Sequence, residues 1–122
     1  MGDRGNIKVG GVYLYTHWCG SQIKTILKKA LKRKLRLKDE AYLTRIIFCE
    51  MLKAGQESLD GETGFGISIS IQDNEHNILE VDCKNQKISE LKQDFENKTD
   101  KRKVLHEWTF KQFIGVKNDT KN

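Results

Sequence analysis

Apolar residues recur at helical spacing in two stretches of the first half of the chain. The first stripe predicts a helix that begins after Ser21, a candidate N-cap, and ends near Leu35. Its apolar members are Ile23, Ile26, Leu27, Ala30, Leu31 and Leu35. The second stripe predicts a helix from Glu40 to Leu52, capped by Asp39 and ended near Gly55. It consists of Leu43, Ile46, Ile47 and Met51, flanked by Tyr42 and Phe48.

Shorter apolar runs with strand character flank these helices. The runs 7–9 and 12–15 are separated by Gly10-Gly11, which predicts a β-hairpin with a two-residue turn. Strict alternation over 67–71 predicts a half-buried strand with isoleucine on one face and serine on the other. Strands over 78–83 and near 87–88 would complete a three-stranded meander over residues 67–88. In front of the hairpin, two glycines within residues 2–6 allow a close approach of the backbone to another segment.

The C-terminal part of the chain is more polar. Residues 89–103 are expected to form a loop or a loosely packed helix, because Leu91 and Phe95 are their main apolar anchors. Residues 107–114 predict a short helix that ends at Gly115 and docks through its aromatic residues on the sheet or on a neighbouring subunit. The predicted fold is therefore α+β: an N-terminal β-hairpin, two helices, an antiparallel β-meander and a short C-terminal helix. We expect one domain over residues 1–116 and a polar tail over 117–122.

Composition and charge narrow the class of protein. A chain of 122 residues with 37% hydrophobic and 32% charged residues suits one small domain, and a homo-oligomer would hide more of its apolar area. No run is long enough for a signal peptide or a membrane span, so a cytoplasmic protein is expected. Three widely spaced cysteines fit reduced, mostly buried thiols. Residues 1–60 carry 12 Lys/Arg against 6 Asp/Glu, whereas residues 61–122 carry 10 against 11. An anionic partner is therefore expected to bind the first half.

A candidate binding site lies where the predicted hairpin leads into the first helix. There residues 13–20 combine aromatic rings, a histidine and the free backbone N–H groups of a helix start, which are natural anion ligands. Polar clusters with glycine at 4–6 and 62–66 also fall at the ends of elements, where loops often carry sites. We expect a pocket for a small phosphorylated ligand, a nucleotide being the best fit, without metal or cofactor. Its expected lining residues are Arg4, Asn6, Tyr15, His17, Trp18, Arg45, Thr63 and Phe65.

The chemistry of these side chains supports that expectation. Arg4 and Arg45 can hold a phosphate bidentately, and His17 can donate a hydrogen bond to it. The rings of Trp18, Tyr15 or Phe65 can stack on a base. Arg45 has an alternative role as a rim residue whose aliphatic stem covers apolar surface. The chain has no Walker-type loop, and its one Gly-x-Gly, at 64–66, lacks the rest of the dinucleotide-binding pattern.

Two other functions remain open. His17 can act as acid or base in a hydrolase that cleaves a phosphodiester or N-glycosidic bond, or it can be a structural histidine bonded to a neighbouring strand. The basic face over Lys24–Lys38 is either solvated or a surface for nucleic acid. A Cys19–His17 nucleophile pair lacks a surrounding signature, and a metal site from His17, His76, Glu75 and Asp73 lacks convincing spacing.

Four short motifs together resemble a group of small proteins of bacteria and their phages. These motifs are G-x-R-G-N at 2–6, Y-T-H-W-x-G at 15–20, R-I-I-F at 45–48 and T-G-F-G-I at 63–67. The resemblance spans residues 2–85, and no established activity comes with it. Small phage proteins of this size include sponges that capture nucleotide immune signals. By that analogy, a ligand-capturing protein acting in the cytoplasm of a host is one expectation for this chain.

Overall fold

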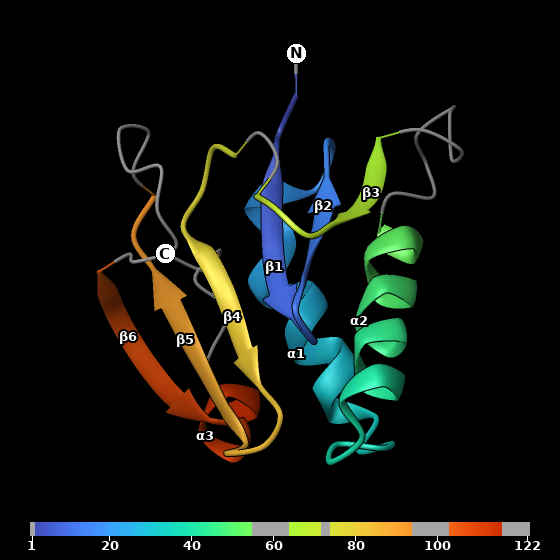
Figure 1. Ribbon diagram of the computed structural model, residues 1–122, viewed down its shortest axis with the longest axis vertical. Helices are drawn as coiled ribbons and strands as arrows, with labels where there is room; N and C mark the ends of the chain where they lie inside the picture. The colour runs from blue at the N-terminus through green and yellow to red at the C-terminus, as the bar shows by residue number, and fades with distance from the viewer. Residues whose placement is uncertain (1, 55–63, 72–73, 94–102, 116–122) are drawn as a thin grey trace.

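The computed structural model describes residues 2–54, 64–71, 74–93 and 103–115. These residues form an α+β fold in which six strands make one sheet in the order β3-β2-β1-β4-β5-β6 (Figure 1). The strands are β1 (Gly5–Val9), β2 (Val12–Thr16), β3 (Phe65–Ser68), β4 (Ile78–Asp82), β5 (Lys87–Leu91) and β6 (Val104–Thr109). The helices are α1 (Ile23–Lys32), α2 (Glu40–Ala54) and α3 (Phe110–Gly115), with a 3-10 turn at Gly20–Gln22. No helix in these ranges is both long and apolar enough to cross a membrane.

The N-terminal hairpin forms as expected. Strands β1 and β2 are antiparallel, and Val9 pairs with Val12 across the two-residue turn. Gly10 and Gly11 have φ values of +61° and +78°. A turn with two left-handed central residues matches the twist of the flanking strands, and glycine adopts this conformation without steric cost.

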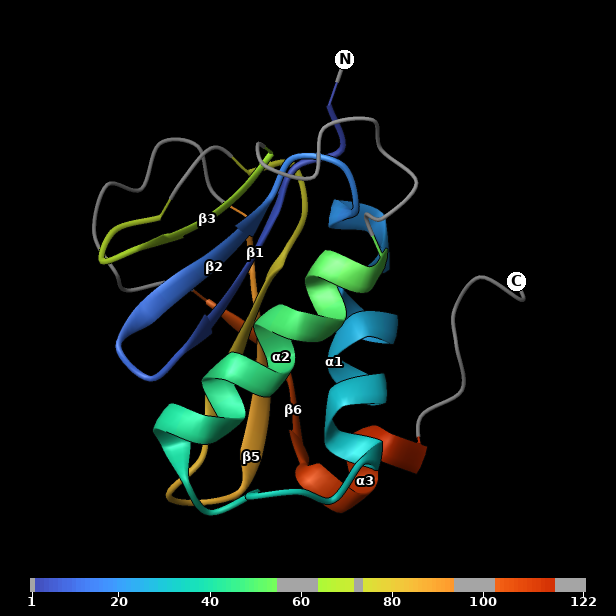
Figure 2. The ribbon, with the colours of Figure 1, turned by 90° about the vertical axis from the view of Figure 1, so that its right-hand side faces the viewer.

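Helices α1 and α2 cover one face of the sheet (Figure 2). The predicted stripe of α1 is confirmed, because Ile23, Ile26, Leu27, Ala30 and Leu31 are all buried. The helix ends at Lys32, however, three residues before the expected Leu35, which is 53% exposed. Beyond the helix, Lys34 and Arg36 both adopt a φ of +53°, so the chain leaves the helical path in a loop.

Helix α2 begins as predicted and runs slightly further. The Asp39 carboxylate accepts a hydrogen bond from the Tyr42 N–H at 3.2 Å, which confirms Asp39 as the cap. The helix extends to Ala54, and the expected terminator Gly55 lies outside the described residues. On its buried side, Glu50 forms an ion pair with Arg33, which follows α1. This pair links the two helices at the end of α1.

Strand β3 differs from its prediction in length, partner and burial. It begins at Phe65 and ends at Ser68, and the Ser70 N–H then bonds to the Ser68 hydroxyl at 3.2 Å. A local bond of this kind competes with pairing between strands. The strand pairs with β2, so it lies at the edge of the sheet. Ile67 and Ile69 are 58% and 87% exposed, in contrast to the expected half-buried isoleucine face.

The antiparallel meander consists of β4, β5 and β6, rather than of residues 67–88. Strand β4 joins the hairpin by parallel pairing with β1, which places Ile7 beside Leu79. The expected helix over 107–114 begins only at Phe110, because residues up to Thr109 belong to β6. Of the region 89–103, Ser89–Leu91 lies in β5, and residues 94–102 lie outside the described part of the chain.

Candidate functional site

The predicted site residues Arg4, Tyr15, His17 and Trp18 lie at the same end of the sheet. The hairpin register pairs Gly5 with Thr16, so Arg4 and His17 continue their strands side by side. The Asp3 N–H bonds to the His17 carbonyl at 2.7 Å, and the His17 N–H bonds to the Gly64 carbonyl at 2.7 Å. The N-terminus, the end of β2 and the start of β3 therefore meet here, at the top of Figure 1.

The His17 ring is packed among its neighbours. Its Nδ1 lies 3.0 Å from the Tyr15 hydroxyl, and Trp18 meets the ring edge-on at a centroid distance of 4.4 Å. A Cβ placed on Gly2 would lie 2.8 Å from Nε2 and Cε1 of the imidazole, so the backbone covers the remaining ring edge. The Tyr15 hydroxyl thus engages Nδ1, and Gly2 packs against the ring edge that carries Nε2. This geometry favours a structural role for His17 over acid–base catalysis.

The Arg4 guanidinium is engaged by a carboxylate of the chain. Glu75 Oε1 accepts hydrogen bonds from the Arg4 backbone N–H at 2.8 Å and from its Nε at 3.3 Å. The bond from the Arg4 backbone, with that from its side chain, holds the pKa of Glu75 below its usual value. The Glu75 N–H bonds in turn to the Arg4 carbonyl at 2.9 Å. A phosphate would therefore compete with Glu75 for Arg4.

The start of the first helical segment, which we expected to bind an anion, holds the Asp3 carboxylate. Both Asp3 oxygens accept from the Ser21 N–H, at 3.0 and 3.1 Å, and Oδ2 accepts from the Ser21 hydroxyl at 2.6 Å. Oδ1 lies 2.6 Å from His76 Nε2. Ser21 therefore donates to Asp3 within a 3-10 turn and is not the N-cap of α1, a position that Gln22 occupies. The chain itself supplies the anion at this helix start.

These bonds predict a pH-dependent contribution of Asp3 to stability. Partial burial raises the pKa of Asp3, but hydrogen bonds from Ser21 and His76 outweigh this and lower it below 3.8. A lowered folded-state pKa gives stability that is full above the unfolded-state pKa and is lost as pH falls through the folded-state pKa. We expect Asp3→Asn to lower the free energy of unfolding by about 1 kcal/mol at pH 6.

The measurement is urea unfolding of both proteins between pH 6 and about pH 2.5, followed by tryptophan fluorescence. The difference between wild type and Asp3→Asn should shrink as pH falls below about 4. Glu75 and Asp82, whose pKa values are also lowered, are present in both proteins and cancel in the comparison. A difference that stays constant over the whole range would contradict this account of Asp3.

The other expected site residues do not join this cluster. Arg45 is exposed, and its guanidinium lies 5.7 Å from the centre of the Tyr42 ring on the same helix. Its neighbour Thr44 packs against Gly10, at the turn of the hairpin, whereas His17 lies beyond the opposite end. At about 3.3 Å per residue, the length of a five-residue strand separates these ends by roughly 16 Å.

Asn6, Phe65 and Thr63 also differ from the expected lining. Asn6 is fully buried, and its Nδ2 donates to Asn74 at 3.1 Å. Phe65 packs against the hydrophobic core, and Thr63 lies outside the described residues. Of the eight expected residues, the structure thus gathers Arg4, Tyr15, His17 and Trp18, and it leaves Arg45 on a separate surface.

The nucleophile and metal alternatives find no support in this geometry. Burial raises the pKa of the Cys19 thiol, which disfavours the reactive thiolate. Glu75 and His76 bond to Arg4 and Asp3, and Asp73 lies outside the described residues. In the part of the chain that the structure describes, no three His, Cys, Asp or Glu side chains gather to hold a metal ion.

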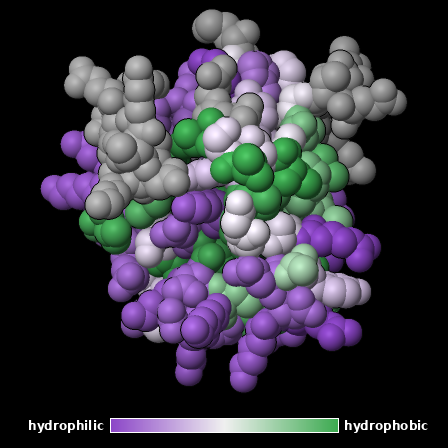
Figure 3. Space-filling view, in the orientation of Figure 1, coloured by the Kyte–Doolittle hydropathy of each residue, from purple (hydrophilic) through white to green (hydrophobic). Residues whose placement is uncertain are grey.

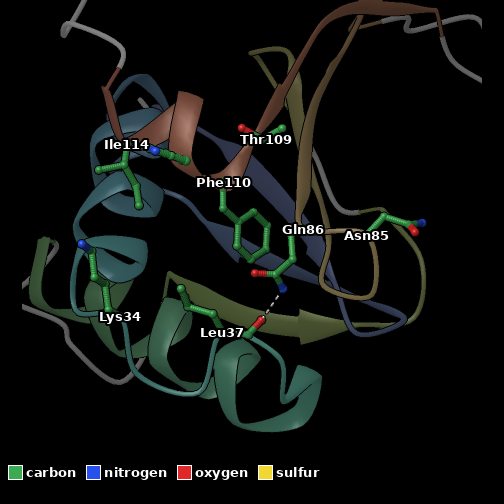
Figure 4. Close-up of a pocket in the computed structure, with 8 residues that line it drawn as sticks. Lys34, Leu37, Asn85, Gln86, Thr109, Phe110 and Ile114 are labelled. Carbon is green, nitrogen blue, oxygen red and sulfur yellow. Dashed lines mark hydrogen bonds between the residues drawn. The ribbon is translucent and has the colours of Figure 1, made fainter.

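A pocket that the sequence did not predict lies at the opposite end of the molecule. Its volume is about 490 Å³, within the range of small-molecule sites. Three segments form it: the loop after α1, the turn between β4 and β5, and the junction of β6 with α3 (Figure 4). The lining residues are Lys34, Leu37, Asn85, Gln86, Thr109, Phe110, Lys111 and Ile114.

The pocket combines an apolar floor with polar groups. Figure 4 shows the Phe110 ring pointing into the space between Leu37 and Gln86. Gln86 Nε2 donates to the Leu37 carbonyl at 2.8 Å and to the Cys83 carbonyl at 2.7 Å, which fixes the amide and leaves its oxygen as an acceptor. Lys34 and Lys111 are exposed and bring positive charge from two different segments.

One sequence signal could have located a wall of this pocket. Thr109 and Gln112 form a reciprocal capping box, with the Thr109 N–H bonded to Gln112 Oε1 at 2.9 Å and the Gln112 N–H bonded to Thr109 Oγ1 at 3.0 Å. The T-x-x-Q spacing places the helix start at Phe110 and marks Thr109 as the cap. The other two segments carry no comparable local signal.

Comparisons with known proteins do not add to this geometry. No protein-family model matches the sequence, and no curated protein or solved structure matches it either.

Proposed function

We propose that this protein binds a small phosphorylated ligand of nucleotide size in the pocket between the loop after α1 and α3. The observation that supports this is an apolar floor flanked by one lysine from each of two segments, Lys34 and Lys111. An ammonium group binds phosphate as a point charge with three donors. Leu37 and Ile114, backed by the buried Phe110 ring, offer an apolar surface for a base, and the oxygen of Gln86 can accept from an N–H group of that base.

The site in this proposal differs from the one expected from the sequence. Arg4 is paired with Glu75, and Asp3 occupies the helix start, so the N-terminal cluster is engaged within the chain. The pocket is lined by apolar, amide, hydroxyl and ammonium groups. Binding or capture of the ligand, rather than proton transfer at neutral pH, is the property that such a lining supports.

The test is calorimetric titration with nucleoside mono- and diphosphates, cyclic nucleotides, the unphosphorylated nucleosides and inorganic phosphate. Lys34→Gln and Lys111→Gln are each expected to weaken binding of a phosphorylated ligand about tenfold, because each removes a charged hydrogen-bond donor. The same variants should leave the weaker binding of a nucleoside within about twofold, since a nucleoside carries no phosphate.

Lys92→Gln is the matched control. Lys92 is exposed and follows β5. The first residue of β5, Lys87, lies next to the turn that lines the pocket. Lys92 is therefore roughly 16 Å from this turn along the strand. Its substitution removes the same charge without touching the pocket and should leave affinity unchanged. No heat with any member of the panel would refute the proposal, as would binding that Lys34→Gln and Lys111→Gln do not affect.

A further inference from the structure

Positive charge continues from the pocket onto the exposed surface of α1. Five of the seven residues from Lys32 to Lys38 are lysine or arginine. Lys29 and Lys32 lie exposed on the last turns of α1, directly before the segment that reaches Lys34 in the pocket wall. Figure 3 shows hydrophilic side chains gathered over the lower end of the molecule, where Figure 1 places α3 and the loop after α1.

Apart from Lys28, which is half-buried on α1, the cations of this region divide into two groups. Lys24 and Arg33 form ion pairs with the buried carboxylates of Glu90 and Glu50, and Arg36 lies 5.0 Å from the centre of the Tyr42 ring. These three cations therefore interact with other side chains of the fold. Among the residues that the structure describes, no carboxylate forms an ion pair with the cations of the second group. That group consists of Lys29, Lys32, Lys34, Lys38 and Lys111.

The second group contains more positive charges than a mononucleotide needs for its phosphate. Lys34 and Lys111 line the pocket, and two ammonium groups can neutralise one phosphate group. Lys29 and Lys32 are three residues apart on one exposed helix face, with a rise of about 4.5 Å between them. A row of cations leading away from a pocket of single-nucleotide size is complementary to a chain of phosphates joined to that nucleotide.

We propose that the phosphorylated ligand is the terminal nucleotide of a single-stranded nucleic acid, whose backbone continues from the pocket along Lys32 and Lys29. This inference rests on the proposed function of the pocket. The base packs on Leu37 and Ile114, Lys34 and Lys111 hold the first phosphate, and the exposed lysines of α1 bind the following phosphates. Affinity then increases with strand length and decreases with salt, while the pocket selects a strand end.

The test compares thymidine 5′-monophosphate with a 5′-phosphorylated oligothymidylate of about eight nucleotides, at several salt concentrations. The oligonucleotide should bind at least about tenfold more tightly, and the slope of log affinity against log salt should steepen by about 0.7 for each additional phosphate bound. The double variant Lys29→Glu/Lys32→Glu should weaken oligonucleotide binding at least about tenfold and leave mononucleotide binding within about twofold. Lys92→Glu is the control for a charge reversal away from this surface and should change neither, and circular dichroism confirms that each variant is folded.

The outcomes separate this inference from the proposed function. Suppose that the mononucleotide binds, that Lys111→Gln weakens this binding about tenfold, and that the oligonucleotide binds with the same affinity and the same salt slope. This result overturns the inference and leaves the proposed function intact. Oligonucleotide binding that Lys29→Glu/Lys32→Glu does not weaken also overturns it. A circularised oligothymidylate that binds as tightly as the linear one contradicts recognition of a strand end. Failure of the oligonucleotide and of every member of the nucleotide panel to bind refutes the proposed function of the pocket.

Discussion

Gly20→Ala is expected to lower the free energy of unfolding by about 3 kcal/mol or more. The Cβ of any residue at this position would lie 2.6 Å from the Arg4 carbonyl carbon and 2.7 Å from the oxygens of Asp3 and Arg4. These neighbours are backbone atoms, which cannot move aside as a flexible side chain does. The same methyl group would also disturb the 2.6 Å hydrogen bond from the Gly20 N–H to the Asp3 carbonyl. Urea unfolding followed by tryptophan fluorescence measures the effect.

Gly115→Ala is the control for this substitution. A Cβ at Gly115 has no atom within 4 Å, and the residue lies at the end of a helix, where alanine has the higher propensity. We expect stability to stay the same or to rise by up to about 1 kcal/mol. If Gly20→Ala changed the free energy of unfolding as little as Gly115→Ala, the fold would not require the close approach of residues 3–4 to Gly20.

The crossing at Gly20 also shows which part of the N-terminal region can be predicted from the sequence. Glycines within residues 2–6 indicated a close backbone approach, and Gly5 does approach another segment, since a Cβ on it would lie 2.8 Å from the Gly20 Cα. The hairpin and the α1 stripe were likewise predictable, because turn chemistry and helical periodicity are local properties. The register of the β1–β2 hairpin places Arg4 beside His17, as expected.

The structure differs from the sequence-based expectations where it depends on contacts between residues distant in sequence. The alternation over 67–71 correctly indicated a strand, but an alternating pattern does not specify its partner. The chain pairs β3 with β2 and leaves Ile67 at an edge. The aromatic run around Trp108 was ambiguous between helix and strand, because short apolar runs fit both periods. Pairing of Ile88 with Trp108 makes it a strand.

The candidate site was only partly predictable for the same reason. Cations and rings at element ends indicate Arg4 and His17 as site residues, but the sequence does not show that Glu75 and Tyr15 engage them. The pocket is built by segments near residues 34–37, 85–86 and 109–114, which approach one another only in the folded chain. The residue types in these segments do not form a binding motif. The pocket therefore results from the packing of α3 and could not be predicted from a motif.

The packing of α3 against the rest of the fold is expected to depend strongly on Phe113. Phe113→Ala is expected to lower the free energy of unfolding by about 3–5 kcal/mol, because the side chain is 1% exposed and its loss leaves a cavity. The Phe113 ring meets Trp108 edge-on at a centroid distance of 5.2 Å, so the cavity would open between α3 and β6. Phe113→Leu keeps most of the apolar volume and should cost less than about 1.5 kcal/mol.

This substitution also tests how the pocket is held together. Six residues are too few for a helix to be stable without tertiary contacts, so α3 depends on the burial of Phe113 and Phe110. In Phe113→Ala, α3 would no longer hold Lys111 at the pocket, and affinity for a phosphorylated ligand should fall at temperatures where the protein is still folded. Calorimetric titration of Phe113→Ala and Phe113→Leu below their unfolding transitions measures this directly. Unchanged affinity in Phe113→Ala would mean that α3 does not form a wall of the binding site.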